Sequence, residues 1–304
     1  MSSTEPTSTP PLDGTDAMAV EALEEEDLPY DEVTLLAPAG QEHGLLTRVG
    51  AELVGTLVVV LAVVGTLLYT GLSGAGAVGV ALAGGMALAG VTAAFGHVSG
   101  AHLNPAVTLA AALTGRTAWL DAALYVVAQV LGAVVGVAVL FVTVPTALPG
   151  LVDSANPEAT TADFLSVTAN GWGEGSPLSV LSGGSVSFGL SAALLVEALA
   201  TAILVAVVLG ASRRGGGAVA IGLTYASMLL VAGPVTNAAL NPARATAVAL
   251  LTAGSDTLPL TQLWGFWLAA LLGGAAVGLA LLAFGRTVTE PIEIDLEDEI
   301  VLER

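Results

Sequence analysis

The chain has 304 residues, of which 55% are hydrophobic and 11% charged, and a composition this apolar excludes an ordinary soluble domain. The formal net charge of −19 excludes nucleic acid as a partner, because its phosphates would be repelled. Without any cysteine, the chain can hold neither a disulfide framework nor a cysteine metal site.

Acidic tails flank the apolar part of the chain. Residues 1–46 are polar and contain Pro, and eleven of the first 42 residues are Asp or Glu, which predicts a disordered N-terminal tail. This tail has no basic segment followed by an apolar stretch, so we do not expect a secretory signal peptide. Residues 288–304 form a second acidic tail.

Residues 47–287 lie between the tails and contain six apolar spans, each long enough to cross the hydrocarbon core of a bilayer. In chain order, the spans are residues 50–69, 78–94, 120–144, 190–210, 218–235 and 263–284. Two shorter apolar segments, 105–113 and 242–251, follow the second and the fifth span. About ten residues of helix extend roughly 15 Å, which is half of the membrane. A polar loop, residues 145–187, joins the two halves.

Both shorter segments are preceded by the same tetrapeptide, Leu-Asn-Pro-Ala, at residues 103–106 and 240–243. Asn is a strong helix N-cap, and Pro is favoured at the first helical position. Each copy therefore predicts the start of a helix at membrane depth. Two such starts in the two halves of one membrane chain indicate a site at the bilayer midplane, built from discontinuous helices.

The two halves also share a glutamate in their first span, Glu52 and Glu197. Three spans per half is an odd number, so the second half must be inverted relative to the first. We therefore predict an all-α membrane protein with six transmembrane helices, two re-entrant half-helices and an inverted 3+3 repeat. The repeats cover about residues 47–144 and 188–287.

Arginine positions predict the orientation in the membrane. With both chain ends on one side, six of the seven basic residues fall on that side, and the positive-inside rule makes this side cytoplasmic. These residues are Arg48, Arg116, Arg213, Arg214, Arg286 and Arg304. The seventh, Arg244, directly follows the second Asn-Pro-Ala. An arginine at the bilayer centre costs about 2.5–3.5 kcal/mol unless it faces water or a partner, so we expect Arg244 to donate to a solute.

Two helix N-termini that face each other at the midplane would repel cations and protons, since each carries about half a positive charge. We expect Asn104 and Asn241 to cap these ends with their side-chain oxygens and to point their NH₂ groups into a lumen. Ordinary helix caps are the alternative. Glu52 and Glu197 are expected to brace the irregular backbone by accepting its N–H groups, with a proton-coupled role as the alternative. His102 is expected to brace the same loop.

The residues around both motifs resemble the two signatures of the aquaporin, or major intrinsic protein, family. The first is Ser-Gly-Ala-His-Leu-Asn-Pro-Ala-Val-Thr at residues 99–108, with Asn104, Pro105 and Ala106 as its core. The second is Asn241, Pro242, Ala243 and Arg244. The resemblance covers about residues 47–286. It implies a homotetramer in which each subunit has its own pore.

The family's selectivity filter falls on Gly84, Leu229, Ala238 and Arg244 when positions are counted from the two asparagines without gaps. Water-specific members usually carry a large aromatic residue where this chain has Gly84, and a histidine where it has Leu229. This pattern indicates a wide, apolar filter. Other positions favour water: Ala245 replaces the Asp usual in glycerol channels, and residues 266–267, Phe-Trp, resemble the water type.

We predict a passive channel in the cell membrane that conducts water, with or without other small neutral solutes, and excludes protons and ions. It would need no cofactor, would carry out no covalent chemistry and would have the lipid bilayer as its surroundings. The alternatives are a wide-filter channel for glycerol, urea or ammonia, and an inverted-repeat secondary transporter. A third is an intramembrane protease with Ser73 as nucleophile and His97 or His102 as base.

The basic residues are all arginine. Acidic excess without lysine favours an organism with a very salty cytoplasm, such as a halophilic archaeon, where screening makes self-repulsion tolerable. Two solvated acidic tails, unrelated to habitat, are the alternative.

Overall fold

The computed structural model describes residues 43–211 and 215–284, and every regular element within these ranges is helical. The predicted C-terminal tail and all but four residues of the predicted N-terminal tail lie outside this part. Arg213, Arg214, Arg286 and Arg304 also lie outside it. The disorder of the tails and most of the arginine pattern therefore stay predictions.

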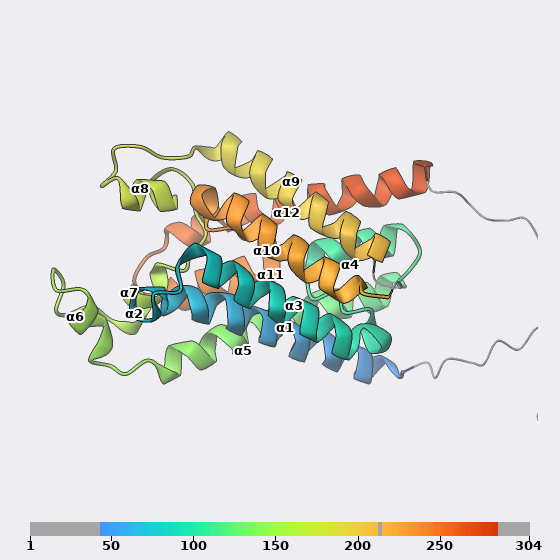
Figure 1. Cartoon of the computed structure of the whole chain (residues 1–304), viewed down its shortest axis with the longest axis horizontal. Helices are drawn as coiled ribbons and strands as arrows, with labels where there is room; N and C mark the ends of the chain where they lie inside the picture. The colour runs from blue at the N-terminus through green and yellow to red at the C-terminus, as the bar shows by residue number, and fades with distance from the viewer. Residues whose placement is uncertain (1–42, 212–214, 285–304) are drawn as a thin grey trace, which may run out of the picture. The chain divides into compact units, whose positions relative to one another are not determined.

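Six long helices run nearly side by side and form the body of the protein (Figure 1). They are α1 (Leu45–Leu68), α3 (Gly76–Ser99), α5 (Trp119–Thr143), α9 (Leu190–Ala211), α10 (Gly217–Thr236) and α12 (Leu258–Phe284). Each is long and apolar enough to cross a membrane, and their outward faces carry large exposed apolar side chains. The six predicted spans are confirmed, although α1 begins five residues and α12 five residues earlier than expected.

Two short helices, α4 (Pro105–Leu113) and α11 (Pro242–Thr252), begin at the prolines of the repeated motif. Asn104 and Asn241 precede them in extended conformation, with φ values of −157° and −146°. The loop that leads into each short helix contains residues with a left-handed backbone conformation. Leu103 and Leu240 are among them, with φ values of 54° and 51°. A non-glycine residue in this region is strained, so packing on all sides must hold these loops in place.

Small residues let the long helices approach closely in pairs that repeat between the two halves. Gly132 of α5 packs on the backbone of Leu53 in α1, and Gly273 of α12 packs on the backbone of Ala198 in α9. Between the halves, Gly85 of α3 and Gly222 of α10 pack backbone to backbone. Such small-residue contacts are the usual means by which helices associate in lipid. The pairs show the repeat, in which α1, α3 and α5 correspond to α9, α10 and α12, and its inversion is seen in the opposite directions of α1 and α9 (Figure 1).

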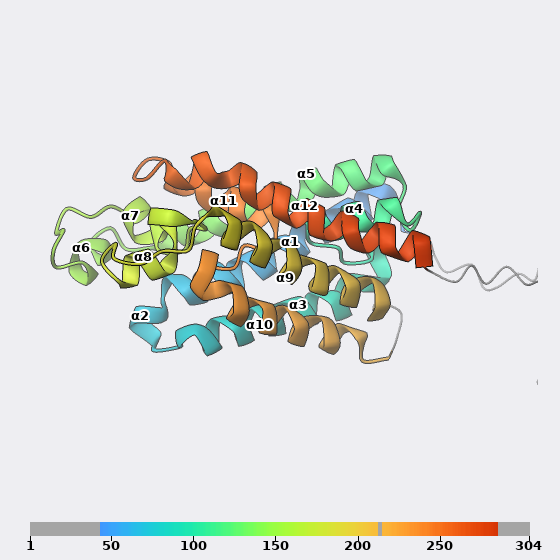
Figure 2. The same ribbon diagram turned by 90° about the horizontal axis from the view of Figure 1, so that it is seen from above.

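One end of the bundle, which we call the loop end, carries short helices. They are α2 (Thr70–Ser73), α6 (Leu148–Val152), α7 (Thr161–Ser166), η1 (Gly173–Gly175) and α8 (Pro177–Leu181). Four of them lie within the predicted polar loop of residues 145–187. Side-chain caps stabilise two of these, α7 and α8, and α7 begins with a capping box of Thr160 and Asp163. Helix α1 begins and α12 ends at the opposite, terminal end (Figure 2).

Candidate functional site

The tips of α4 and α11 meet inside the bundle and are joined by two crossed hydrogen bonds. The side-chain nitrogen of Asn104 donates to the carbonyl oxygen of Leu240 at 2.7 Å, and that of Asn241 donates to the carbonyl oxygen of Leu103 at 2.8 Å. Both asparagines are buried. The two asparagines are 137 positions apart in the chain, yet they occupy equivalent positions where the two helix tips meet.

Each asparagine also caps its own helix, as the sequence predicted. The side-chain oxygen of Asn104 accepts from the N–H of Ala106, and that of Asn241 accepts from the N–H of Ala243, both at 2.9 Å. The expectation that the whole NH₂ group faces a lumen differs from the structure. One N–H of each amide is taken by the opposite repeat, because Leu103 and Leu240 present their carbonyl groups there. The second N–H is the donor left for a solute.

The carboxylate of Glu52 holds the loop before α4 through four hydrogen bonds. Its Oε1 accepts from the hydroxyl of Ser99 at 2.7 Å and the N–H of His102 at 2.9 Å. Its Oε2 accepts from the N–H of Leu103 at 2.7 Å and the side-chain amide of Gln129 at 2.8 Å. Glu52 is fully buried, so these bonds replace the water that a carboxylate otherwise requires.

Glu197 holds the equivalent loop before α11. Its Oε1 accepts from the hydroxyl of Thr236 and, at 2.8 Å, from the N–H of Ala239, while its Oε2 accepts from the N–H of Leu240 at 2.8 Å. The two glutamates thus fix the two residues, Leu103 and Leu240, whose carbonyl groups receive the crossed asparagine bonds. Carboxylate, loop and asparagine form one connected network in each half.

Arg244 lies in the first turn of α11 and is buried, with 1% of its surface exposed. Its Nη1 donates to the carbonyl oxygens of Asn237, at 3.0 Å, and Ala238. Both residues have left-handed backbone conformations, which turn their carbonyl groups toward the guanidinium. Nη2 makes no hydrogen bond with the described residues, so it is the donor available to a solute.

Three cavities lie one after another along the bundle axis. The loop-side cavity, about 340 Å³, contains Arg244 and Ala238, and Val63 of α1 lines it. The central cavity, about 20 Å³, contains both asparagines, and Val59 of α1 lines it. The terminal-side cavity, about 320 Å³, is lined by Arg48, nearer the start of α1. Positions 63, 59 and 48 descend along one helix, so the cavities follow each other from the loop end to the terminal end.

The terminal-side and central cavities share His102, and the central one is large enough for about one water molecule. The backbone N–H of His102 donates to Glu52, while its ring lines both cavities. That ring is 3.3 Å from the hydroxyl of Thr108 through Nδ1 and packs edge-on against Tyr125. The sequence assigned His102 only the structural task.

Gly84 lies beside Leu229 but does not line the loop-side cavity. A Cβ atom at Gly84 would lie 2.6 Å from Val63 Cγ2, 2.7 Å from Leu229 Cδ1 and 3.3 Å from Tyr225 Cε1. We call these four residues the narrow section; Val63 and Leu229 line the loop-side cavity, and Tyr225 lines the central one. Tyr225 was not a candidate from the sequence, because no motif spacing marks it.

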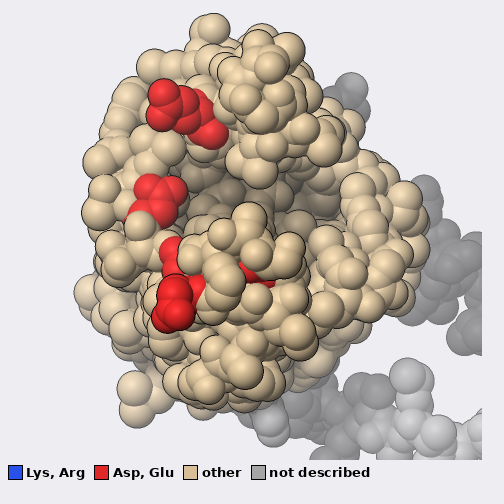
Figure 3. All heavy atoms as spheres, turned by 90° about the vertical axis from the view of Figure 1, so that its left-hand side faces the viewer, with Lys and Arg blue, Asp and Glu red and all other residues tan. Residues whose placement is uncertain are grey.

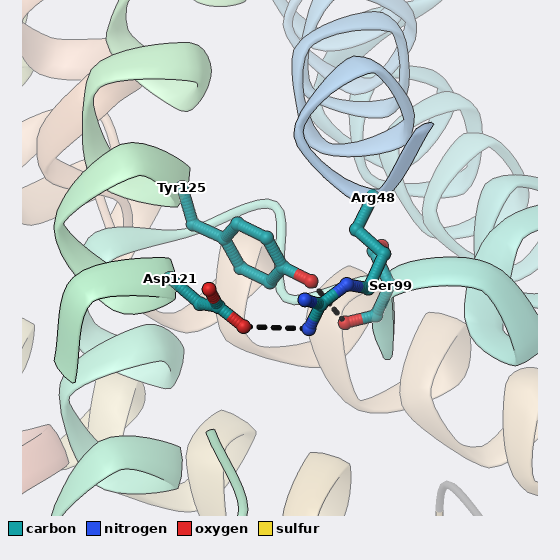
Figure 4. Close-up of polar contacts among 4 residues, drawn as sticks. All are labelled: Arg48, Ser99, Asp121 and Tyr125. Carbon is teal, nitrogen blue, oxygen red and sulfur yellow. Dashed lines mark hydrogen bonds and ion pairs between the residues drawn. The ribbon is translucent and has the colours of Figure 1, made fainter. Parts of the chain in front are cut away.

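At the terminal end, polar contacts hold the entrance to the terminal-side cavity (Figure 4). Arg48 of α1 pairs with Asp121 of α5 at 2.6 Å, and the hydroxyl of Tyr125 donates to the carbonyl oxygen of Ser99 at 3.2 Å. Arg116 donates to the carbonyl oxygen of Leu209 at 2.5 Å. Two arginines therefore line this entrance, one of them paired with a carboxylate.

The loop end has the opposite charge character. Five acidic residues lie in its loops and short helices: Asp153, Glu158, Asp163, Glu174 and Asp256. Figure 3 shows acidic side chains along one side of a central hollow on this face and no basic ones among the atoms drawn as described. Hydrogen bonds from Ser255 and Thr160 lower the pKa of Asp163 to about 2, so it stays ionised down to strongly acid pH.

The residues needed by a serine protease are not brought together. Ser73 ends α2 just before α3 begins, and His97 lies in the last turn of α3. About 21 residues of straight helix separate His97 from the start of α3, which amounts to roughly 30 Å. His102 lies deeper in the bundle, in the network of Glu52. Among the described residues, no group of three His, Asp or Glu side chains suits a metal ion either.

The sequence is similar to a known family over most of its length. The profile of the family described as "Major intrinsic protein" matches residues 41–281. The chain is 37% identical over 241 residues to the Aquaporin Z of Photorhabdus laumondii subsp. laumondii, which covers 77% of this chain and 95% of that protein. It is 36% identical over 241 residues to the Aquaporin Z of Brucella melitensis biotype 1, with the same coverage.

A solved structure with a similar fold is the X-ray structure of the aquaglyceroporin from Plasmodium falciparum. The TM-score is 0.58 with 20% sequence identity, and the match covers 78% of this chain and 96% of that one. At this level of identity the likeness concerns the fold alone. It agrees with an all-helical bundle of six long helices and two short ones.

Proposed function

Because the chain belongs to the major intrinsic protein family, we propose that it is a passive membrane channel that conducts water. The observation that carries the proposal is the central cavity, where the amides of Asn104 and Asn241 meet between two wider cavities. Each amide keeps one N–H free for a lone pair. A water molecule could accept these bonds in passing, without any step of covalent chemistry.

Exclusion of protons and ions follows from the same geometry. The N-termini of α4 and α11 point toward the central cavity, so two positive dipole ends meet there. Arg244 adds a full positive charge on the loop side. A cation that enters would lose its hydration shell and would meet hydrogen-bond donors in place of acceptors. Water molecules that accept from the two amides would be turned in opposite directions on either side of them, which interrupts the hydrogen-bonded chain that protons need. Both effects are general for aquaporin-type pores.

We place the selectivity filter at Gly84, Leu229, Ala238 and Arg244. Arg244, Leu229 and Ala238 line the loop-side cavity, which supports three of these positions, and Gly84 lies directly behind Leu229. The filter would then combine one cationic donor with small or apolar side chains. That composition favours a second candidate, a channel that also passes glycerol, urea or ammonia.

Osmotic shrinkage of proteoliposomes tests the proposal. Vesicles that contain the protein should shrink faster than empty vesicles under a sucrose gradient, while a pH dye inside them reports no added proton flux. Equal shrinkage rates would contradict the water channel. Parallel gradients of glycerol, urea and ammonia, measured on the same vesicles, decide between the two candidates by the ratio of each permeability to that of water.

A secondary transporter has less support. It would need coupling residues in its core, and the buried acidic groups of the described membrane segments are Glu52 and Glu197, since Asp121 lies in the first turn of α5 and pairs with Arg48. Both carboxylates are occupied by hydrogen bonds to the loops that they hold. Uptake that saturates and that follows a proton gradient would favour the transporter over the channel.

We further propose a homotetramer in the cell membrane with both chain ends in the cytoplasm. The start of α1 and the end of α12 lie at the same end of the bundle, where Arg48 and Arg116 also lie. The mass of the detergent-solubilised particle tests the tetramer. Proteolysis of the two acidic tails in sealed right-side-out vesicles tests the orientation, since cytoplasmic tails would be protected.

A further inference from the structure

We propose that Tyr225 determines which solutes pass, because its ring borders Gly84 in the narrow section and lines the central cavity beside both asparagines. The inference rests on the proposed channel function and adds a specificity residue that the filter positions do not include. A wide filter, as Gly84, Leu229 and Ala238 alone suggest, would then not be the narrowest point of the conduit.

Tyr225 lies one turn before Leu229 on α10, nearer the terminal end. The ring carbon Cε1 would be 3.3 Å from a Cβ atom at Gly84, so the aromatic ring packs beside the glycine on the neighbouring helix α3. An alanine in place of Gly84 would already crowd Val63 and Leu229. The packing of the narrow section therefore requires a glycine here. The neighbouring side chains already fill the space in which a side chain at position 84 would lie.

Tyr225 also lines the central cavity together with Asn104 and Asn241. The residue is 3% exposed, yet its hydroxyl makes no hydrogen bond with the described residues. A buried tyrosine hydroxyl normally finds a partner, so a solute in the conduit is the partner that the geometry provides. The hydroxyl can both donate and accept, whereas the asparagine amides and Arg244 offer donors.

The narrowest point is thereby shifted by one helical turn, from the level of Arg244 toward the two asparagines. A solute passes first through a wide apolar vestibule and then past one aromatic ring before it reaches the amides. Pore width at that ring decides the size limit. Water fits a cavity of about 20 Å³ beside the ring, while glycerol, with six heavy atoms, requires the ring to be absent or displaced.

The test compares water and glycerol permeability in proteoliposomes for wild type, Tyr225→Leu and Tyr225→Phe. Tyr225→Leu removes the ring, so the glycerol-to-water ratio should rise on the order of tenfold, the discrimination that small changes of space give in apolar sites. Tyr225→Phe keeps the ring, so this ratio should stay low. Tyr69→Leu is the matched control, since Tyr69 packs on Phe164 and lines none of the three cavities.

An unchanged glycerol-to-water ratio in Tyr225→Leu, with wild type conducting water, would overturn the inference and leave the channel function intact. Wild-type vesicles that shrink no faster than empty ones would overturn both. If Tyr225→Leu does not fold, Gly84→Ala probes the same section from the neighbouring helix α3. Its added methyl group should lower water permeability severalfold, and an unchanged permeability in a folded Gly84→Ala protein would place the conduit elsewhere.

Discussion

Removal of the acceptors at Glu52 should destabilise the loop before α4. In Glu52→Gln, one carboxylate oxygen becomes an NH₂ group. The better orientation places this group at Oε1, where the hydroxyl of Ser99 can rotate to accept from it, but the N–H of His102 loses its acceptor. A buried donor without a partner costs about 1–3 kcal/mol. In Glu52→Leu, all four donors lose their acceptors, so this variant should be considerably less stable than Glu52→Gln.

Thermal unfolding in detergent micelles measures this order. The midpoint should fall from wild type to Glu52→Gln to Glu52→Leu, and water permeability of proteoliposomes should fall with it, because the carbonyl group of Leu103 would no longer be held for Asn241. Glu174→Gln is the control, since this glutamate is exposed at the loop end and its replacement should change stability by less than about 0.5 kcal/mol.

Equal midpoints for wild type and Glu52→Leu would refute the reasoning, because they would mean that the four hydrogen bonds contribute nothing. A stable Glu52→Gln protein that has lost only a proton-dependent flux would instead support the proton-coupled role. A structural role of Glu52 predicts that stability and water permeability fall together, whereas a proton-coupled role predicts a loss of flux without a loss of stability.

Three further predictions concern other parts of the chain. Arg244→Val should admit larger solutes or ions, since the donor of the loop-side cavity is lost; unchanged permeability ratios in proteoliposomes would remove Arg244 from the pathway. Gly132→Ala should cost about 1–3 kcal/mol because its methyl group would overlap the backbone of α1, whereas Gly90→Ala, with open space around it, should be neutral or stabilising by up to about 1 kcal/mol. Asp163 has a pKa of about 2 in the folded chain, below its ordinary value of 3.8, so it stabilises the protein above pH 4 and loses this effect as the pH falls toward 2. The difference in melting temperature between wild type and Asp163→Asn should therefore shrink over that range, and a difference that stays constant would contradict the role of the Ser255 bond.

Most of the fold could be predicted from the sequence because its signals are local. Apolar length marks the six spans, and the Asn-Pro pairs mark the first residues of α4 and α11. Boundaries without such signals were less accurate. Helix α12 begins before the expected residue because Asp256 accepts from the N–H of Leu258 and Pro259 suits the first turn, a start signal that lies in a polar stretch.

The site could be predicted only where the residues carry their own pattern. Asn104, Asn241 and Arg244 belong to motifs, and the paired glutamates repeat between the halves. Tyr225 and Gln129 were missed because their roles depend on which helix faces which. Gln129 reaches both Glu52 and Thr108 from α5, and nothing in the spacing along α5 indicates this contact. Similarly, the carbonyl partners of the two amides follow from the meeting of two loops and not from either loop alone.

The crossed bonds between the two tips have a consequence for how the protein forms in the membrane. Each half supplies the acceptor that the other half's asparagine needs, so an N-terminal half inserted by itself would leave the amide nitrogen of Asn104 and the carbonyl group of Leu103 without these partners. Lipid cannot replace them. We therefore expect the two crossed hydrogen bonds to form only after the second half has been inserted into the membrane.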